Sequence, residues 1–395
     1  MSGHRHLVWN IAVREFRRLV RDPNMFLILF VAPLAYTALY GSIYLRKIER
    51  DVPVDIVDLD RSTMSRNLIR EIDALEYVRV RQVGVDEEQA KDAMLRSEIQ
   101  AWVLIPDGFA RDLNYGRSTT LPLVLSPGRL LVLSDVGIGI SQAAATFGAR
   151  IRAGVLAREG TPVSQNPSYA TPIGFTYTPL FNPWLTYGDM ILPALMAVIF
   201  LQLVFIGAAA ATASESASNT WAGLFANSGD EVRWAVAGKM VMFVGVFLCF
   251  AALLRGTVIP LFDIHLGGNW LILLCLLFLA FWAASGMGIF LGSYFRFRTT
   301  AFVVLGFTSY PFFLLSGYAW PEAQMMLPLR LLSRLLPTTP FLQGINLLTQ
   351  MENGWEVLLP HLLNLLVLGA LFSVLAWMRF RRMQHQYVLA VEECR

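Results

Sequence analysis

Residues 25–60, MFLILFVAPLAYTALYGSIYLRKIERDVPVDIVDLD, decide the fold of this chain because an apolar run changes there into polar sequence. The apolar part, 25–45, is long enough to cross the hydrocarbon core of a bilayer as a helix. Polar sequence then continues to about residue 188, where the next apolar run begins. The stretch therefore predicts a first membrane-spanning helix followed by a large hydrophilic insertion, 46–188.

The composition of the whole chain is that of a membrane protein. Hydrophobic residues make up 55% of the 395 residues and charged residues 15%, whereas a soluble domain carries about a quarter charged residues. Gly288 and Gly292 form a GxxxG pair, which favours close helix packing within one subunit or between two. The sequence predicts a polytopic α-helical membrane protein with six transmembrane helices, the first at 25–45 and the others within 189–380, at 190–211, 236–259, 270–293, 299–319 and 358–378.

The N-terminal segment, 1–24, predicts a helix that lies along the membrane surface. Its apolar residues recur at helical spacing and basic residues occupy the remaining positions, which is typical of an interfacial helix on an anionic surface. A signal peptide is disfavoured because the basic region is too long and the next apolar run has spanning length. The predicted apolar face comprises Ile11, Ala12, Phe16, Leu19 and Val20, and the predicted membrane-interface arginines are Arg14, Arg17, Arg18 and Arg21.

Lysine and arginine in short flanking segments indicate the orientation of the spans. Basic residues are concentrated before span one, between spans four and five at Arg296 and Arg298, and after span six. With six spans these three regions lie on one side, so we expect cytoplasmic N- and C-termini, a cytoplasmic tail at 381–395 and an extracytoplasmic insertion. The basic residues at the start of the insertion oppose this only weakly, because long domains translocate largely regardless of charge.

The insertion alternates strand-like and helix-like segments. Apolar alternation favours the strands, and a capping pattern at Asp86 and Gln89 favours one of the helices between them. We therefore expect an inserted α/β extracytoplasmic domain, followed by a longer helix at 130–158 and a connector at 161–184 that is rich in proline and aromatic residues. The predicted strands are 54–59, 78–83, 101–106 and 121–126.

The sequence lacks the motifs of a self-sufficient enzyme. It contains no GxxxxGK[ST] phosphate loop and no HExxH zinc pattern. Asp55, Asp58 and Asp60 offer too few oxygen ligands for a calcium or magnesium site, so we interpret them as a polar strand edge and turn. The net charge of +3 is too small to suggest nucleic-acid binding. We expect no catalytic residue, no metal and no directly bound cofactor.

Four segments, in their order along six spans, resemble the permease subunit of a type-2 ABC exporter. VDIVDLDRSTMSRNLI (54–69) and AWVLIPDGFARDLNYG (101–116) resemble parts of that family's extracytoplasmic domain. FNPWLTYGDMILPAL (181–195) resembles the opening of its second span, and LLSGYAWPEAQMMLPLRLLSRLLPTTPFLQGI (314–345) resembles its signature after the fifth. The subfamily with a large domain between spans one and two includes multidrug exporters of the bacterial inner membrane. The resemblance implies that span two opens with Asn182, Pro183 and Pro193.

The resemblance also implies a separate cytoplasmic ATPase that binds loop 212–239, TASESASNTWAGLFANSGDEVRWAVAGK, through a short coupling helix. An acid-flanked pair of large apolar residues on a short cytoplasmic segment is what a hydrophobic contact with a partner needs. An ordinary connecting loop is the alternative. The predicted ATPase-coupling residues are Glu215, Thr220, Trp221, Leu224 and Lys239, with Trp221 and Leu224 supplying the hydrophobic contact.

This loop departs from the family pattern at several positions. Ala217 and Ala222 stand where glutamates are usual, Asn219 replaces a glycine and Ser228 replaces a proline. These departures change the strength or identity of the expected ATPase contact. They suit a heterodimer in which the other permease carries the better coupling helix.

The function implied by the resemblance is export. Two permeases, copies or paralogues, would form a pathway at their interface, and a partner ATPase carrying ATP and Mg would drive it, so the chain itself would not be an enzyme. Membrane lipids and a periplasmic adaptor protein are further candidate partners. Lys239 and Arg255 lie near span ends where they can snorkel, which favours an amphipathic or apolar substrate. The alternative is a non-transporting scaffold or regulator whose extracytoplasmic domain binds a partner.

Residues 312–328, FFLLSGYAWPEAQMMLP, begin as the end of span five and then break. We expect Pro321 to start a short helix at its first position, with the negative charge of Glu322 favoured by the helix dipole. Residues from 322 to about 336, within segment 320–345, are predicted to re-enter the membrane under a cover of protein or beside a cavity. Glu322 is then a helix-start residue or part of a gate. The predicted extracytoplasmic gate residues are Ser316, Gly317, Trp320, Pro321 and Glu322.

Overall fold

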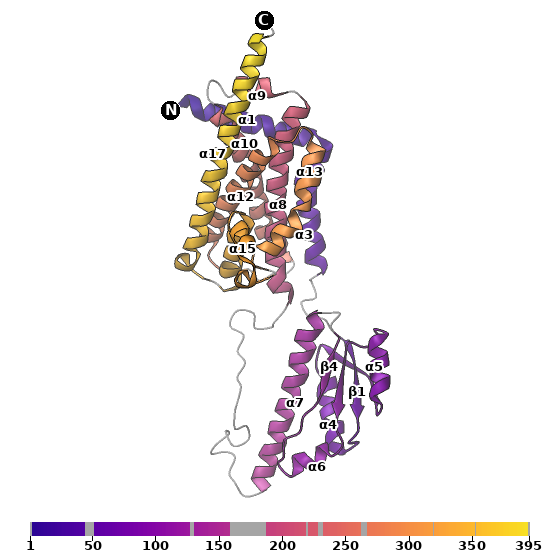
Figure 1. The fold of residues 1–395 in the computed structure, drawn as a ribbon. Helices are drawn as coiled ribbons and strands as arrows, with labels where there is room; N and C mark the ends of the chain where they lie inside the picture. Colours follow the sequence, from indigo (N-terminus) through magenta and orange to yellow (C-terminus); the bar gives the residue numbers. More distant parts are fainter. Residues whose placement is uncertain are drawn as a thin grey trace. The chain divides into compact units, whose positions relative to one another are not determined.

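The computed structural model describes the chain in two separate units, shown in Figure 1. The membrane unit comprises Met1–Leu45 and Gly188–Arg395, and the α/β unit comprises Arg46–Tyr187. The second unit spans nearly the same residues as the predicted insertion. The structure describes residues 2–43, 51–126, 130–158, 187–218, 220–227, 232–261, 267–318, 320–351 and 353–393. Asn182, Pro183 and the connector at 161–184 lie outside these residues.

The α/β unit is built on a four-stranded sheet of order β2-β1-β3-β4. The strands β1, β2 and β3 are parallel, and β4 runs antiparallel to β3. The parallel strands require crossover helices, which the chain supplies between them. The strands are β1 (Val52–Asp58), β2 (Val78–Gly84), β3 (Ala101–Ile105) and β4 (Leu123–Leu125), and the helices are α4 (Thr63–Asp73), α5 (Glu87–Leu95), α6 (Phe109–Asn114) and α7 (Leu130–Arg158).

Helices cover both faces of this sheet, so its central strands β1 and β3 are mostly buried, whereas the edge strand β2 is mostly exposed. Helices α4, α6 and α7 form one core with Val54 and Ile56 of β1, whereas α5 packs with Val57 on the opposite face. The acidic residues of β1 are used structurally: Asp55 pairs with Arg81 at 2.8 Å, and Asp58 accepts a hydrogen bond from Ser65 Oγ at 2.7 Å. Asp58 thus lies at the strand end and accepts from the turn that follows, as expected, whereas Asp55 is buried inside a central strand.

The membrane unit is a helical bundle. Its described residues include six helices long and apolar enough to cross a membrane, as the sequence predicts: Pro23–Ile43, Leu192–Ala217, Arg233–Leu261, Trp270–Gly292, Arg298–Leu315 and Trp355–Gln386. The elements are α1 (Ser2–Arg21), α2 (Pro23–Phe26), the π-helix η1 (Leu27–Val31), α3 (Ala32–Ile43), α8 (Tyr187–Ala217), α9 (Trp221–Asn227), α10 (Arg233–Gly256), α11 (Val258–Leu261), α12 (Trp270–Gly292), α13 (Arg298–Phe307), α14 (Ser309–Leu315), the 3₁₀ turn η4 (Glu322–Gln324), α15 (Leu327–Arg334), α16 (Thr338–Ile345), the π-helix η5 (Asn346–Gln350) and α17 (Trp355–Glu393).

Helices α8 and α12 form the interior of the bundle and touch closely through glycine. A Cβ added to Gly288 would collide with the backbone of Phe205, and one added to Gly292 would collide with Ala209. Both neighbours belong to α8 of the same chain, so the GxxxG pair packs two helices of one subunit. Small residues let the two backbones approach where larger side chains would hold them apart.

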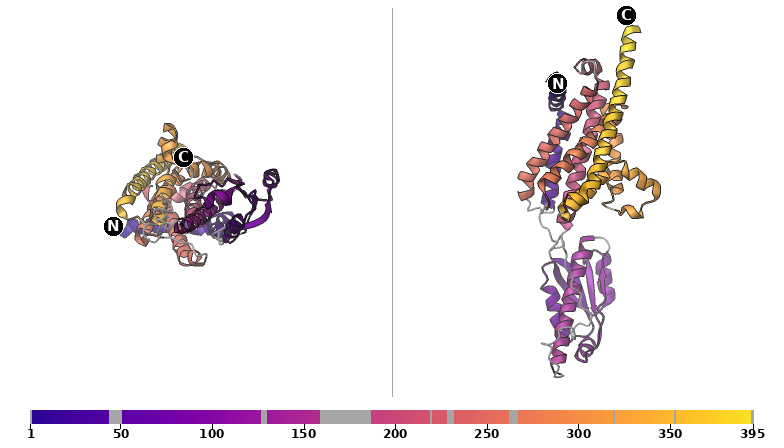
Figure 2. Two further views of the ribbon diagram at one scale, coloured as in Figure 1. Left: turned by 90° about the horizontal axis from the view of Figure 1, so that it is seen from below. Right: turned by 90° about the vertical axis from the view of Figure 1, so that its left-hand side faces the viewer.

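The segment after span five differs from its prediction. Helix α14 ends at Leu315, and Gly317 takes a left-handed conformation with φ of 81°, which a glycine adopts without strain. Pro321 precedes the single 3₁₀ turn η4 instead of starting a helix. Helix α15 carries exposed leucines and projects from the side of the bundle (Figure 2, right), so the bundle does not cover it, and membrane re-entry of segment 320–345 stays a prediction. The buried element is α16, which bears no charged residue, whereas α15 carries Arg330 and Arg334.

Candidate functional site

The candidate site begins with the way α1 packs along α10, at the end of the membrane unit where α9 also lies (Figure 1). Ile11 of α1 is fully buried, and a Cβ added to Gly238 of α10 would collide with its side chain and with the carbonyl of Val8. Gly238 thus permits the two helix backbones to lie close together. This contact fixes α1 against the third span.

Helix α1 has three faces, where the sequence predicted two. At 100° per residue, one face is buried and carries Glu15 between Ile11 and Leu19. A second face is apolar but exposed, with Trp9, Phe16 and Val20 at 65%, 41% and 39% exposure. The predicted apolar residues therefore lie on one continuous side of the helix, but only Ile11, Ala12 and Leu19 are buried in the bundle, whereas Phe16 and Val20 are exposed. The third face is basic and comprises Arg14, Arg17, Arg18 and Arg21.

A cluster of buried charges joins this helix to two spans. Lys239 Nζ of α10 donates to Glu15 Oε2 at 2.8 Å and to Glu215 Oε1 of α8 at 3.2 Å. All three side chains are 0% exposed. Because an isolated buried charge is strongly unfavourable, these contacts offset the cost of burying the three side chains. Lys239 consequently does not snorkel, contrary to the expectation from its place near a span end.

Two arginines of α1 complete the cluster around Glu215. Arg14 donates to both carboxylate oxygens of Glu215, at 3.1 and 3.2 Å, and Arg18 Nη1 lies 2.6 Å from Oε1. Burial would lower the pKa of Arg14, but its hydrogen bond to Glu215 and the charges of both glutamates outweigh burial and raise it. The cluster therefore brings two acidic and three basic side chains into mutual contact.

The same carboxylate reaches the short helix α9. Thr220, the residue before α9, donates its hydroxyl to Glu215. Arg18 Nη2 donates to the carbonyl of Ser214 at 3.0 Å and to Ser218 Oγ at 2.8 Å. Glu215 thus accepts hydrogen bonds or ion pairs from α1, from α10 and from the residue that begins the turn into α9.

Trp221 and Leu224 of α9 lie inside the protein. Leu224 is 0% and Trp221 8% exposed, and the Trp221 ring stacks on Phe225 and meets Phe380 of α17 edge-on, with centroids 5.6 and 5.2 Å apart. The prediction that these two side chains form a hydrophobic contact with the ATPase is therefore wrong. They fix α9 to the bundle and leave Ala222 exposed. Asn219 and Ser228 lie outside the described residues.

The predicted gate residues lie at the other end of the spans, where α14 ends. Ser316 Oγ donates to the carbonyl of Phe313 at 2.6 Å, and the side chain of Ser316 is buried. Glu322 binds Arg334 Nε at 3.1 Å and accepts a hydrogen bond from Gln343 at 3.4 Å. Glu322 therefore ties η4 to α15 and α16, whereas Trp320 is 55% exposed. Pro193 lies inside α8, near its first turn.

Sequence reasoning missed two residues of the cluster region. Glu15 is an acid in an otherwise basic helix and lies on the same helix face as Ile11 and Leu19. This position was the only feature of the local sequence that could have indicated its role. Asp22 caps α2 and pairs with Arg298 of α13. Burial would raise the pKa of Asp22, but hydrogen bonds from Met25 N, Arg298 and Asn24 N lower it.

Comparison with known proteins places this bundle in a family. The model of the ABC-2 family transporter protein matches residues 24–378. Two relatives are each 23% identical over 400 residues, covering 96% of this chain and 98% of their own length: the inner membrane transport permease YhhJ of Escherichia coli strain K12 and that of Shigella flexneri. The matched region includes four of the six candidate spans completely and most of the first and the sixth, together with Glu215, Lys239 and α9. This chain therefore belongs to the ABC-2 family of transporter proteins.

Proposed function

We propose that this chain is the membrane-spanning permease subunit of an ATP-driven ABC exporter and that the buried charge cluster couples it to a separate ATPase. The single observation that carries the proposal is that Glu215 contacts three other elements. This residue lies at the last turn of α8 and binds Lys239, Arg14 and the hydroxyl of Thr220. A force applied to α9 therefore reaches α8, α10 and α1 through one carboxylate.

The cluster transmits motion because it is costly to separate. Removing one partner of a buried ion pair costs about 3–5 kcal/mol, since the other charge is left buried and unpaired. Helices joined by such a cluster move together when a partner pulls on any one of them. ATP and Mg stay on the partner ATPase, and the permease itself carries out no hydrolysis.

The proposed orientation puts α1, α9 and both termini in the cytoplasm and residues 46–188 outside it. The exposed apolar face of α1, with Trp9 and Phe16, then lies in the lipid, and the exposed arginines Arg17 and Arg21 meet the anionic headgroups of the inner leaflet. Substrate would leave through a pathway between this chain and a second permease. We propose an amphipathic or apolar substrate because spans four to six are apolar.

The ATPase contact proposed here differs from a contact through Trp221 and Leu224. Those side chains hold α9 in place, and the exposed residue Ala222 faces outward where the family has a glutamate. A small uncharged surface binds a partner weakly, so we propose that a paralogous permease supplies the stronger ATPase contact. A periplasmic adaptor would bind residues 46–188.

The experiment compares Glu215→Gln with Glu356→Gln, which changes an exposed acid at the start of α17. The permease is reconstituted with its co-purified ATPase, and both ATPase binding and the acceleration of ATP hydrolysis by transport substrate are measured. We expect Glu215→Gln to keep the ATPase bound and to lose the acceleration, and Glu356→Gln to keep both. Unchanged acceleration in Glu215→Gln would remove this residue from the coupling route.

A scaffold or regulator is the second candidate function, and the absence of the family's glutamate at Ala222 favours it. In that case the native complex would contain a partner bound through residues 46–188, and the purified complex would hydrolyse no ATP. Identification of every subunit in the native complex distinguishes the two functions, because a scaffold would be isolated without an ATPase.

A further inference from the structure

A basic recess lies beside the charge cluster, where α1, α2 and the first residue of α13 meet. It measures about 730 Å³ and is open to the outside. Its charged lining comprises one acidic and five basic side chains: Asp22, Arg14, Arg17, Arg18, Arg21 and Arg298. The recess therefore gathers arginines from α1 and α13 in one cavity.

The acidic side chains nearby bind only part of this basic lining. Arg14 and Arg18 contact Glu215, and Arg298 pairs with Asp22. Among the described residues of the recess and the charge cluster together, six basic side chains meet three acidic ones. This excess of three basic groups attracts anions.

Arg17 and Arg21 supply the groups of the recess that can bind an added anion. Both are exposed, and within the described part of the chain neither forms an ion pair with an acidic side chain. They stand four residues apart on one face of α1, and like charges at this spacing repel each other. An anion bound between them relieves that repulsion and forms ion pairs that the described residues leave unmade.

An exposed apolar surface adjoins these arginines. Val20 is exposed and lies about 60° around α1 from Arg17, at 100° per residue. Phe16 meets Phe30 of η1 edge-on, and Phe26 stacks on the same ring, with centroids 5.9 and 5.3 Å apart. The apolar surface thus continues from α1 onto span one. A lipid uses both surfaces, with its phosphate at the arginines and its chains along the apolar side chains, whereas a soluble anion would use the basic surface alone.

We infer that the recess is a defined binding site for the phosphate of an anionic lipid, which Arg17 and Arg21 hold while the acyl chains lie along the exposed apolar face of α1. Guanidinium binds phosphate through paired N–H donors. The inference deepens the proposed function and rests on it only for the leaflet in which α1 lies. The headgroup contact of α1 then becomes one selective site instead of a diffuse attraction to the membrane surface.

Native mass spectrometry of the full chain, purified in a neutral detergent without an ATPase, tests the inference. Phosphatidylglycerol and phosphatidylcholine with identical chains are titrated separately, and the dissociation constant of the first bound lipid is measured for each. Both lipids contain a phosphate, but only phosphatidylglycerol has a net negative charge. We expect it to bind at least about tenfold more tightly, as charge-assisted hydrogen bonds predict. Equal dissociation constants would overturn the inference.

Two double variants of equal net charge locate the selectivity. Arg17→Gln with Arg21→Gln should remove the preference for phosphatidylglycerol. Arg381→Gln with Arg382→Gln should keep it, because these exposed arginines lie outside the recess and follow Phe380, which contacts α9 at the same end of the bundle. Retention of the preference in the first double variant, or its loss in both, would reject the site.

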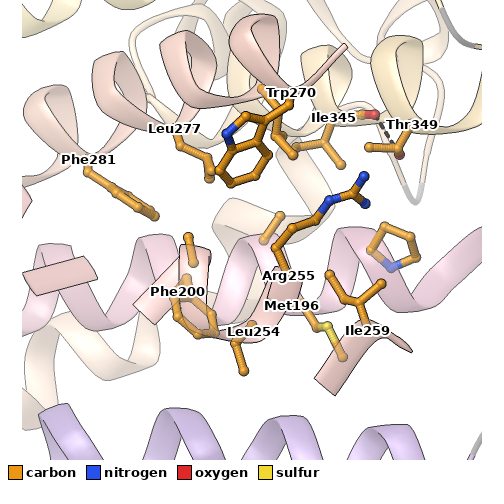
Figure 3. A pocket seen from close by; sticks show the side chains of 14 residues that line it. Met196, Phe200, Leu254, Arg255, Ile259, Trp270, Leu277, Phe281, Ile345 and Thr349 are labelled. Atoms are coloured by element: carbon orange, nitrogen blue, oxygen red, sulfur yellow. Dashed lines mark hydrogen bonds between the residues drawn. The ribbon is translucent and has the colours of Figure 1, made fainter. Parts of the chain in front are cut away.

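Arg255 provides a further control at the other end of α10. It lines a separate cavity of about 90 Å³ and lies over the Trp270 ring, 6.0 Å from the centroid (Figure 3). Arg255→Gln removes the same charge as either single substitution in the recess and should leave the lipid preference unchanged. A loss of the preference in this variant would show that the selectivity does not come from the recess.

Photolabelling of the unaltered chain tests the position of the lipid without any variant. A phosphatidylglycerol probe with a diazirine near the head of one acyl chain is added to the chain in phosphatidylcholine nanodiscs, and the modified residues are identified by mass spectrometry. We expect residues 16–31 to be modified more than they are by the matching phosphatidylcholine probe. Modification confined to other surfaces would overturn the inference.

Two further results would assign the recess to a different anion. Displacement of the probe by glycerol 3-phosphate, at the concentrations at which phosphatidylglycerol displaces it, would show that the acyl chains contribute nothing. Loss of the co-purified ATPase from the Arg17→Gln with Arg21→Gln variant, with the lipid preference kept, would identify the recess as a protein contact. The lipid titrations contain no ATPase, so a failure of the proposed function leaves their outcome unchanged.

Discussion

Lys239 Nζ lies 2.8 Å from Glu15 Oε2, although the two residues are 224 positions apart and neither side chain is exposed. This ion pair fastens the N-terminal helix α1 to the start of the third span. Because Glu215 shares the same lysine at 3.2 Å, the N-terminal helix is also fastened to the second span. A helix that sequence alone places on the membrane surface is thus part of the bundle.

Replacement of Glu15 by alanine should destabilise the membrane unit strongly. The variant leaves Lys239, Arg14 and Arg18 around a single carboxylate, and breaking a buried pair costs about 3–5 kcal/mol. The measurement is thermal unfolding of the purified chain in one detergent. Glu356→Ala, an exposed acid, is the control and should change the free energy of unfolding by less than about 0.5 kcal/mol. Equal unfolding temperatures for the two variants would show that the pair is dispensable.

Leu224→Ala should reduce stability as well as coupling. The side chain of Leu224 is fully buried, and truncation of a buried leucine costs about 2–5 kcal/mol through lost burial and a residual cavity. A role confined to the ATPase contact would leave thermal unfolding unchanged. Unfolding curves of the permease purified without an ATPase separate these outcomes.

Ala222→Glu should strengthen the ATPase contact without affecting the fold. The residue is exposed on α9, so the added acid stays in water and restores the charge that the family carries at this position. Co-purification of the ATPase should rise at low ionic strength and fall toward the original level as salt screens the charge. Salt-independent binding equal to that of the unaltered chain would argue against an ATPase surface at Ala222.

Asp22 should make stability depend on pH in the acidic range. Its pKa is lowered in the folded protein by hydrogen bonds from Met25 N, Arg298 and Asn24 N, which outweigh the opposing effect of burial. The lowered pKa stabilises the folded protein at pH values above the pKa of the unfolded chain, which is about 3.9. This stabilisation is lost as the pH falls through the pKa of the folded protein. Asp22→Asn should therefore unfold at a lower temperature than the unaltered chain at pH 7, and the difference should shrink below about pH 4. A constant difference across pH would assign the effect to something other than the carboxylate charge.

Gly288→Ala should be destabilising where Gly245→Ala is not. A Cβ at Gly288 meets the backbone of Phe205, whereas one at Gly245 meets nothing within 4 Å. Alanine otherwise favours a helix interior over glycine by about 1 kcal/mol. The unfolding temperature should therefore fall for Gly288→Ala and stay the same or rise for Gly245→Ala. The reverse order would contradict the close contact of α8 and α12.

The helices and strands were predictable because the signals for them are local. A run of bilayer length such as 25–45 forms a spanning helix wherever it lies, so all six candidate spans were visible in the sequence. The strand at 54–59 was visible in the same way and corresponds to β1, Val52–Asp58. The break at Gly317 was also predictable from the local sequence, but the course of the chain after it was not. Whether α15 or α16 is buried depends on which of them packs against α12 and α17.

The arrangement of the cluster was decided by tertiary structure alone. The sequence identifies Glu215 and Lys239 through the resemblance of one loop, and it identifies Trp221 and Leu224 as a large apolar pair on a short polar segment. It cannot pair Glu15 with a lysine 224 positions away, because periodicity reports which residues share a face and not which helix covers that face. For this chain, the apolar runs fixed which segments cross the membrane, and the packing of α1 against α10 determined which charges are buried together.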